Sequence, residues 1–384
     1  MFKPDERIGA LSTFLKHLDK LGTDGKKLRY FRGHSNQSFQ LKPSIFRNPG
    51  LIGNEATMLK ELILRCPNDF TGRPTTFQCL VKMQHYGLPT RLLDVTSNPL
   101  VALFFACEGN DEKDKDGEVI IFDYDVDEVK YFDSDTVSVI SNLSRRPSGF
   151  SVPEFPDIEN ATQDDLINGF NQQEAIKLLL HDIGSDKPHF LPKVLREDLL
   201  RVVCVKPLLD NPRIIRQEGA FLLYGCNTTK LEPAPLEDKV VSGRFTINRD
   251  EKQNLLNQLR TLGISRATMY PEIEQVAKYV KDAHWMPSID LSKLTPIQAS
   301  VFGVLRDGPA RTVLDVTSIL ATSTPTISSR TVSRAISELQ GKGAVELVGS
   351  GRERRWQRAG NISLVEASEL PKLQPISNHG IQPA

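Results

Sequence analysis

This chain lacks an excess of charge of either sign, and it lacks long apolar stretches. Its 48 Lys and Arg residues equal its 48 Asp and Glu residues, so no overall field attracts nucleic acid or a membrane, and such binding needs a local patch. No run of about 18 apolar residues occurs, and the first residues have no apolar core of signal-peptide length. We therefore expect no transmembrane helix, no membrane partner and a cytoplasmic location.

Cysteines are few, and their pattern argues against a metal site and against a disulfide framework. They are odd in number, scattered along the chain and never spaced as CxxC: Cys66, Cys79, Cys107, Cys204 and Cys226. This usage fits a reducing cytosol, and we expect no metal. Carboxylates do not cluster at the spacing that two catalytic metal ions need, so nucleic-acid cleavage is the least favoured activity.

The 384 residues are enough for two or three domains. Mixed strands and helices over residues 1–284 predict an α+β domain with a mixed central sheet and peripheral helices. Residues 285–294 predict a linker, residues 295–360 a small helical domain, and residues 361–384 a disordered tail. The oligomeric state stays open between a monomer and a homo-oligomer.

Apolar periodicity predicts most elements of the first domain. Helices are expected at 5–21, 54–66, 75–86, 99–108, 250–262 and 271–283, and from about 163 to 180. Strands are expected at 27–31, 39–41, 118–124, 129–132, 199–205 and 245–247, and from residue 220. Residues 144–165 predict a long irregular loop.

Residues 84–107 organise this domain. Their first half is polar and rich in turn residues, whereas residues 100–106 are almost wholly apolar. This predicts a loop that faces a cleft and a buried helix that anchors it. A simpler interpretation is a loop that caps a core helix, with Pro99 at the first helical position. Arg91 and Asp94 would then form a salt bridge that holds the loop.

Arg32 ends the predicted strand at 27–31 and precedes Gly33. The planar fork of arginine makes paired hydrogen bonds to phosphate, and a glycine beside it lets backbone or ligand approach closely. The alternative is a surface arginine that pairs with a carboxylate.

Several short motifs follow one another in the first domain. They are residues 30–34 (YFRGH), residues 84–94 (QHYGLPTRLLD), Asn98-Pro99, residues 102–106 (ALFFA), Arg213, Gln217, Gly219, Phe221, Gly263-Ile264 and Met269-Tyr270-Pro271. In this order they resemble the FRG domain family, named for its aromatic-Arg-Gly motif. Val95 departs from the pattern, because many members carry an aromatic residue there. The biochemistry of the family is poorly defined, so the resemblance alone implies no activity.

The layout also looks like that of ADP-ribosyltransferases. The likeness rests on an Arg-Gly pair ending an early strand, a Thr-Ser segment before a helix, and a late Gln-Glu pair beside a strand. It implies that Arg32 holds the phosphates of NAD and that Glu218, with Gln217 as neighbour or substitute, promotes loss of nicotinamide. Cleavage of the nicotinamide–ribose bond develops a cation that a carboxylate stabilises. The simpler interpretation of Glu218 is an exposed residue before a strand.

The same likeness assigns further contacts with NAD, which would be a substrate. His85 and Tyr86 would stack on the nicotinamide half or hydrogen-bond to it. The groups that would orient them are Thr90, Arg91, Asp94 and Thr96. The expected binding set is Arg32, Gly33, His85, Tyr86, Thr90 and Thr96.

Residues 295–360 read as three helices followed by a hairpin, and they resemble the winged helix-turn-helix. In that fold the third helix enters the major groove and the wing reaches phosphate. Between residues 328 and 358 there are seven basic and three acidic residues, which is the local positive face that DNA binding needs. The expected DNA-binding residues are Arg330, Thr331, Arg334, Arg352, Arg354 and Arg355. Winged helices also serve as dimerisation or protein-docking modules.

Two functions follow from these features. The first is an NAD-consuming enzyme, an ADP-ribosyltransferase or NAD glycohydrolase, fused to a DNA-binding domain; a toxin or a phage-defence effector would fit such an enzyme. The second is a transcriptional regulator without catalysis, which senses a nucleotide or another phosphorylated ligand. Ligand recovered intact would favour the regulator.

Overall fold

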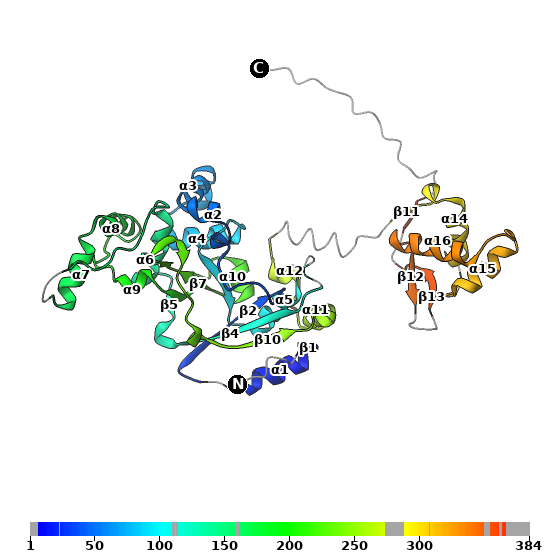
Figure 1. Ribbon diagram of the computed structural model, residues 1–384, viewed down its shortest axis with the longest axis horizontal. Coiled ribbons are helices and arrows are strands. Elements are labelled where there is room, and N and C mark those ends of the chain that lie inside the picture. Colours follow the sequence, from blue (N-terminus) through cyan, green and yellow to red (C-terminus); the bar gives the residue numbers. More distant parts are fainter. Residues whose placement is uncertain are drawn as a thin grey trace, which may run out of the picture. The chain divides into compact units, whose positions relative to one another are not determined.

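The computed structural model describes residues 7–22, 24–109, 112, 114–157, 161–272, 288–306, 308–348, 354–360 and 363–365. The chain divides into two compact units, Met1–Ala277 and Lys278–Ala384, each with its own hydrophobic core (Figure 1). Most of the predicted helix at 271–283, part of the predicted linker, Arg352 and nearly all of the predicted tail lie outside the described residues.

An eight-stranded mixed sheet forms the centre of the first unit. Its order is β1(Arg7–Ile8), β10(Val241–Ile247), β4(Gly117–Asp125), β2(Lys27–His34), β3(Leu92–Thr96), β7(Gly219–Tyr224), β6(Val202–Lys206) and β5(Lys130–Tyr131). Only the outermost pairs, β1 with β10 and β5 with β6, are parallel. The α+β fold class with a mixed sheet is therefore confirmed for this unit.

The sheet is nearly divided at its middle. β2 pairs with β4 along its whole length, and β3 does so with β7. Between β2 and β3 the ladder holds a single residue pair, Phe31 with Thr96. The sheet therefore consists of two halves, β1-β10-β4-β2 and β3-β7-β6-β5, and we call the narrow join between β2 and β3 the seam.

Side-chain alternation along the strands builds three cores. On one face, a single core that includes Tyr30 of β2 and Val95 of β3 spans both halves. On the other face, each half has its own core, with Phe31 in one and Leu92 in the other. The seam is thus bridged by apolar packing on one face only.

Helices cover both faces of this sheet (Figure 1). The α-helices are α1(Leu11–Lys20), α2(Pro49–Gly53), α3(Glu55–Arg65), α4(Thr76–His85), α5(Pro99–Cys107), α6(Asp135–Asn142), α7(Gln163–Asn171), α8(Glu174–Asp186), α9(Arg196–Leu199), α10(Pro212–Gln217), α11(Lys252–Thr261) and α12(Arg266–Met269). The 3-10 turns are η1(Ser44–Arg47), η2(Pro67–Phe70), η4(Val126–Glu128), η5(Leu143–Arg145), η6(Asp238–Val240) and η7(Arg249–Glu251), and β8(Cys226–Asn227) pairs with β9(Thr229–Pro233).

The second unit contains three helices and a hairpin around one small core. The helices are α14(Pro296–Arg306), α15(Val313–Ala321) and α16(Ser329–Gly341), and the hairpin is β12(Val345–Val348) with β13(Arg355–Arg358). Val301, Val316, Ile336 and Val345 contribute one residue each from four of these elements to the core. The turn η8(Leu291–Lys293) and the parallel pair β11(Ser288–Asp290) with β14(Ser363–Val365) complete the unit.

The strongest sequence signals gave the right elements. The helices expected at 54–66, 75–86 and 99–108 are α3, α4 and α5. The Asn98 side chain accepts a hydrogen bond from the Leu100 amide, and Pro99 occupies the first helical position as predicted.

Other predictions were wrong. Residues 39–41 form no strand, and the polar half of residues 84–107 contains the central strand β3. Arg32 lies inside β2, which runs on to His34. The helix expected from 163 to 180 is two helices, and α6 was not expected at all.

Candidate functional site

A cavity of about 210 Å³ opens at the seam, and we call it the seam pocket. Its walls come from both halves of the sheet and from the elements that pack against them: Phe31, Arg32, Gly33, Asp94, Val95, Thr96, Phe105, Arg213, Gln217 and Tyr270. The cavity therefore combines two arginines and a carboxylate with aromatic rings.

Arg32 makes two hydrogen bonds, one across the seam to β3 and one within β2. Its Nη1 donates to the backbone carbonyl oxygen of Asp94 at 2.6 Å, and its Nε donates to Nε2 of His34 at 2.9 Å. Within the described residues its Nη2 makes no hydrogen bond. An arginine held in this way is preorganised, because less side-chain freedom remains to be lost on binding.

The fold requires a glycine at position 33. A Cβ atom added at Gly33 would lie 1.9 Å from the carbonyl oxygen of Ala102 in α5. Strand β2 and helix α5 therefore approach each other more closely than any side chain would allow. This close packing brings Phe105 of α5 to the same cavity as Arg32.

Arg213 enters the seam pocket from helix α10. The helix begins at Pro212, and the side chain of Asn211 caps it by accepting from the Arg213 amide at 2.8 Å. The guanidinium of Arg213 lies 4.8 Å from the ring centroid of Tyr270, and its Nη1 donates to the carbonyl oxygen of His85 at 3.1 Å. Arg32 and Arg213 thus place two positive charges on one cavity.

Hydrogen bonds among neighbouring polar side chains hold the remaining polar wall. Gln84 donates to the Asp94 carboxylate at 2.8 Å, and Thr90 donates to the Gln84 amide oxygen at 2.7 Å. The Thr96 hydroxyl donates to the carbonyl oxygen of Gln217 at 2.6 Å, and the Gln217 side chain donates to the carbonyl oxygen of Met269.

Glu218 does not line the seam pocket. It follows α10 in the left-handed conformation, with φ at 45°. Its exposed carboxylate accepts hydrogen bonds from Ser97 at 3.1 Å and from Asn98 at 2.9 Å. Of the predicted Gln-Glu pair, the structure therefore brings Gln217 to Arg32 and leaves Glu218 beside the start of α5.

The remaining predicted contact residues are spread out. His85 lines a small neighbouring cavity of about 30 Å³ that shares Asp94 and Arg213 with the seam pocket, and its Nε2 lies 3.0 Å from Glu272. Burial lowers the pKa of His85, and the charge of Arg213 lowers it further. Tyr86 is 65% exposed and lies away from the seam pocket, while Thr90 is fully buried.

Arg91 does not pair with Asp94. It is fully buried and makes a two-pronged salt bridge with Glu55, at 2.9 and 2.6 Å. The Nζ of Lys230 lies 3.2 Å from the same carboxylate. Successive strand residues face opposite ways, so Arg91 turns into the protein while Asp94 faces the pocket. The predicted salt bridge was wrong, and Arg91 belongs to the frame.

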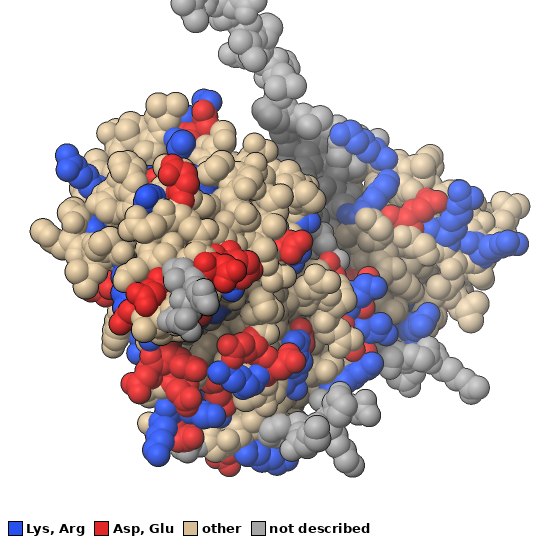
Figure 2. Space-filling model, turned by 60° about the vertical axis from the view of Figure 1, so that its left-hand side comes forward, with Lys and Arg blue, Asp and Glu red and all other residues tan. Residues whose placement is uncertain are grey.

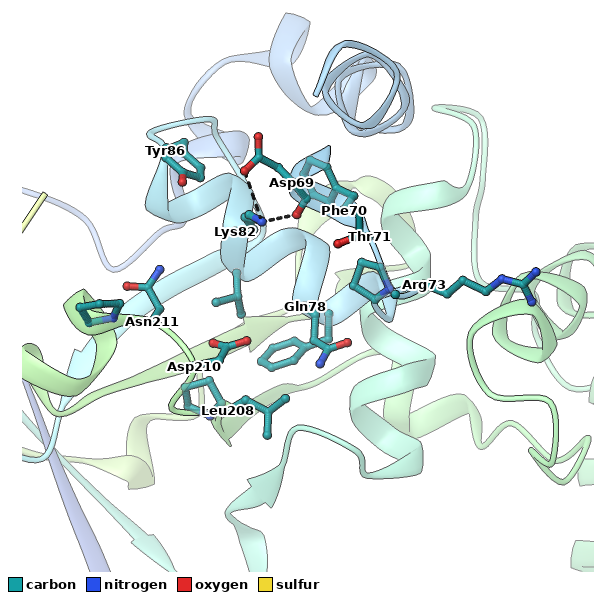
Figure 3. A pocket seen from close by; sticks show the side chains of 16 residues that line it. Asp69, Phe70, Thr71, Arg73, Gln78, Lys82, Tyr86, Leu208, Asp210 and Asn211 are labelled. Atoms are coloured by element: carbon teal, nitrogen blue, oxygen red, sulfur yellow. Dashed lines mark hydrogen bonds and ion pairs between the residues drawn. The ribbon is translucent and has the colours of Figure 1, made fainter. Parts of the chain in front are cut away.

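A larger cavity of about 490 Å³ lies on the outer side of α4, between η2 and the loop that precedes α10 (Figure 3). Of the predicted site residues, it is lined by Tyr86 alone. Lys82 donates to the carbonyl oxygen of Asp69, and Arg73 extends away from the other labelled side chains (Figure 3). This cavity presents no arginine pair comparable to that of the seam pocket.

The predicted DNA-binding residues occupy two parts of the second unit. Arg330 and Arg334 are exposed on α16, and Arg334 pairs with Glu338 one turn away at 3.0 Å. Thr331 takes part in the N-terminal cap with Ser328. Arg354 and Arg355 are exposed at the start of β13.

Charge is distributed without a dominant sign. Acidic and basic side chains are interspersed over the face shown in Figure 2. No described helix has the length and apolar character of a membrane span. In the part of the chain that the structure describes, no group of three or more His, Cys, Asp or Glu side chains is placed to hold a metal ion.

Part of the site was not predicted from the sequence. Arg213 carried a motif resemblance but no assigned role, and Phe105 and Tyr270 were only motif positions. The sequence does not predict that these residues line one cavity with Arg32. Arg32 and Tyr270, for example, are far apart in sequence and come together only at the seam pocket.

One comparison with known proteins gives a match. Residues 27–115 match the FRG domain, so the chain contains an FRG domain that includes Arg32 and Asp94 but ends well before Arg213. No curated protein and no solved structure matches the chain.

Proposed function

We propose that the seam pocket binds a phosphorylated, nucleotide-type ligand, and that NAD is its substrate. The observation that carries the proposal is the convergence of Arg32 and Arg213 from different elements on one cavity. Each guanidinium can form paired hydrogen bonds with phosphate oxygens. Two of them match a diphosphate better than a single carboxylate.

The rest of the cavity supports a nucleotide rather than free phosphate. Phe105 and Tyr270 supply aromatic surface beside the arginines. At about 210 Å³ the pocket encloses only part of a dinucleotide. The remainder would extend past the rim, where Ser97, Asn98 and Glu218 form a polar edge.

Cleavage of NAD requires a carboxylate that stabilises positive charge on the ribose. Asp94 lines the pocket, and Glu218 stands outside its lining beside Thr96 and Ser97. Glu218 is the carboxylate that the ADP-ribosyltransferase resemblance assigns to this role. Asp94 is the alternative that the cavity itself offers.

The test is release of nicotinamide from NAD by the full chain. We expect release by the wild type and a fall of about tenfold or more for Arg32→Ala and Arg213→Ala, since each removes a charge-assisted contact. Asp94→Asn and Glu218→Gln identify the carboxylate, because loss of the catalytic one lowers the rate by about 100-fold or more. Arg216→Ala, an exposed arginine on the same helix as Arg213, is the matched control.

A regulator without catalysis is the second candidate. It is favoured by the position of Glu218, whose carboxylate is engaged by Ser97 and Asn98. In that case the first unit binds its ligand intact, and the second unit binds DNA through α16 and the β12–β13 hairpin, as in a winged helix. NAD recovered unchanged, together with DNA affinity that responds to the ligand, would support this candidate over the enzyme.

A further inference from the structure

Behind Arg32 lies a buried hydrogen-bonded chain of three side chains. His34 is 3% exposed and Glu118 is 5% exposed. Nδ1 of His34 lies 3.1 Å from Oε1 of Glu118, and Nε2 of His34 lies 2.9 Å from Nε of Arg32. The pairing of β2 with β4 sets His34 directly opposite Glu118. We call Glu118, His34 and Arg32 the relay.

The chemistry of the three groups fixes the proton on His34. Arginine can only donate, so Nε2 of His34 must be the unprotonated acceptor. The ring proton then resides on Nδ1 and is donated to the carboxylate of Glu118. Both hydrogen bonds are satisfied only when His34 is neutral and in this tautomer.

Charged groups around the ring favour the same state. His34 is surrounded by Arg32 on β2, Glu118 on β4 and Arg244 on β10. The ring centroids of His34 and Phe39 lie 6.0 Å apart in an edge-to-face arrangement. Arg244 also donates to both oxygens of Glu118, at 3.1 and 2.9 Å. Burial lowers the pKa of His34, and the charges of Arg32 and Arg244 lower it further against the opposing pull of Glu118.

We infer that His34 and Glu118 are positioning residues that hold Arg32 in its ligand-binding orientation, and that phosphorylated ligands bind only while His34 is neutral. The inference rests on the proposed binding of such a ligand in the seam pocket. It makes the ligand affinity of that pocket depend on pH through His34 and Glu118, two side chains that do not contact the ligand.

Protonation of His34 breaks the relay at one bond. Nε2–H would then face the Nε–H of Arg32. Two donors cannot form a hydrogen bond, and the two positive charges repel each other. Arg32 loses this restraint, so ligand binding must order the side chain again. Acidification should therefore weaken binding even though the charge on Arg32 itself is unchanged.

Three variants isolate the relay. His34→Gln offers one amide oxygen to Arg32 and one NH₂ to Glu118, and it cannot titrate. His34→Ala removes both bonds. His181→Gln, at an exposed histidine on α8, controls for loss of a histidine elsewhere.

Binding is measured by calorimetric titration of the full chain with ADP-ribose, a probe that holds the diphosphate and cannot release nicotinamide. Between about pH 8 and a pH below the pKa of His34, which lies under the ordinary 6.5 of histidine, we expect the Kd of the wild type and of His181→Gln to rise, by up to about tenfold for each pH unit below that pKa. His34→Gln should bind within about threefold of the wild type at the higher pH and lose the pH dependence. His34→Ala should bind about tenfold more weakly than the wild type at the higher pH, as expected for loss of a hydrogen bond to a charged group.

A second readout needs no ligand. The ¹⁵N spectrum of the imidazole should place the proton of His34 on Nδ1 and show that the pKa of His34 is below the ordinary value of 6.5 for histidine. A proton on Nε2, or a pH dependence of binding in His34→Gln equal to that of the wild type, overturns the inference and leaves the proposed function standing. A wild-type chain that binds no ADP-ribose at any pH refutes the proposed function and takes the ligand part of the inference with it.

Discussion

The guanidinium of Arg32 donates a 2.6 Å hydrogen bond to the backbone carbonyl oxygen of Asp94. This bond joins β2 to β3 where the sheet ladder between them holds only one residue pair. A side chain thus replaces a missing backbone bond, and the space left by the missing ladder is the seam pocket. The same residue that closes the sheet also lines the pocket, where it would contact the proposed ligand.

Replacement of Gly33 by alanine should destabilise the fold. The new Cβ would meet the carbonyl oxygen of Ala102 at 1.9 Å, so β2 and α5 must separate. We expect the free energy of unfolding to fall by about 2–3 kcal/mol or more. Chemical denaturation measures this change.

Gly184→Ala in α8 is the matched control, because no atom lies within 4 Å of the added Cβ. It should leave stability unchanged or raise it by up to about 1 kcal/mol. Equal effects at the two glycines would contradict the close packing of β2 on α5.

The buried cluster of Glu55, Arg91 and Lys230 predicts an order of costs. Glu55→Gln leaves two buried cations without their counter-ion and should cost about 3–5 kcal/mol of stability. Lys230→Met leaves the pair of Glu55 with Arg91 intact and should cost clearly less. The reverse order, measured by denaturation at neutral pH, would show that Lys230 is essential to the cluster.

Lys230 also predicts a pH dependence of stability. Burial lowers the pKa of Lys230 to about 8, against 10.5 for an ordinary lysine. Between these values the unfolded chain holds more protons, so the free energy of unfolding should rise with pH, by an amount on the order of 3 kcal/mol. Lys230→Met should lack this rise, and an unchanged slope in that variant would refute the assignment.

If the second unit binds DNA as proposed, its affinity for DNA should depend on salt. If Arg330 contacts phosphate, Arg330→Ala should reduce the slope of log Kd against log salt by about 1, uniformly across DNA sequences. Arg260→Ala, at an exposed arginine on α11 of the first unit, is the control. A slope that is equal for the wild type and both variants would remove Arg330 from the interface.

Several elements of the fold could be predicted from the sequence. Helix α5 could be predicted from the apolar residues around Phe104 and from Asn98-Pro99 at its start. Helix capping depends only on residues that are adjacent in sequence. Spacing of apolar residues likewise gave α3 and α4. Arg32 was singled out because an arginine beside a glycine is chemically distinctive.

The central strand β3 was missed for a physical reason. Thr90, Arg91 and Asp94 make the segment look like a loop, although Arg91 is neutralised inside the protein by Glu55, a residue 36 positions away. Only the tertiary contact makes a buried charge acceptable directly before a buried strand. Gln217 and Glu218 were expected directly before a strand, but Gln217 ends the short helix α10 and lines the pocket, and Glu218 follows it outside the lining.

The central claim is that Arg32 and Arg213 bind the same diphosphate group. The most direct measurement is a double-mutant cycle on the Kd of ADP-ribose, with Arg32→Ala, Arg213→Ala, the double variant and the Arg216→Ala control. We predict a loss of about tenfold or more for each single variant, a non-additive loss for the pair, and wild-type affinity for the control. Wild-type affinity in both single variants, or no binding by the wild type, would contradict the claim.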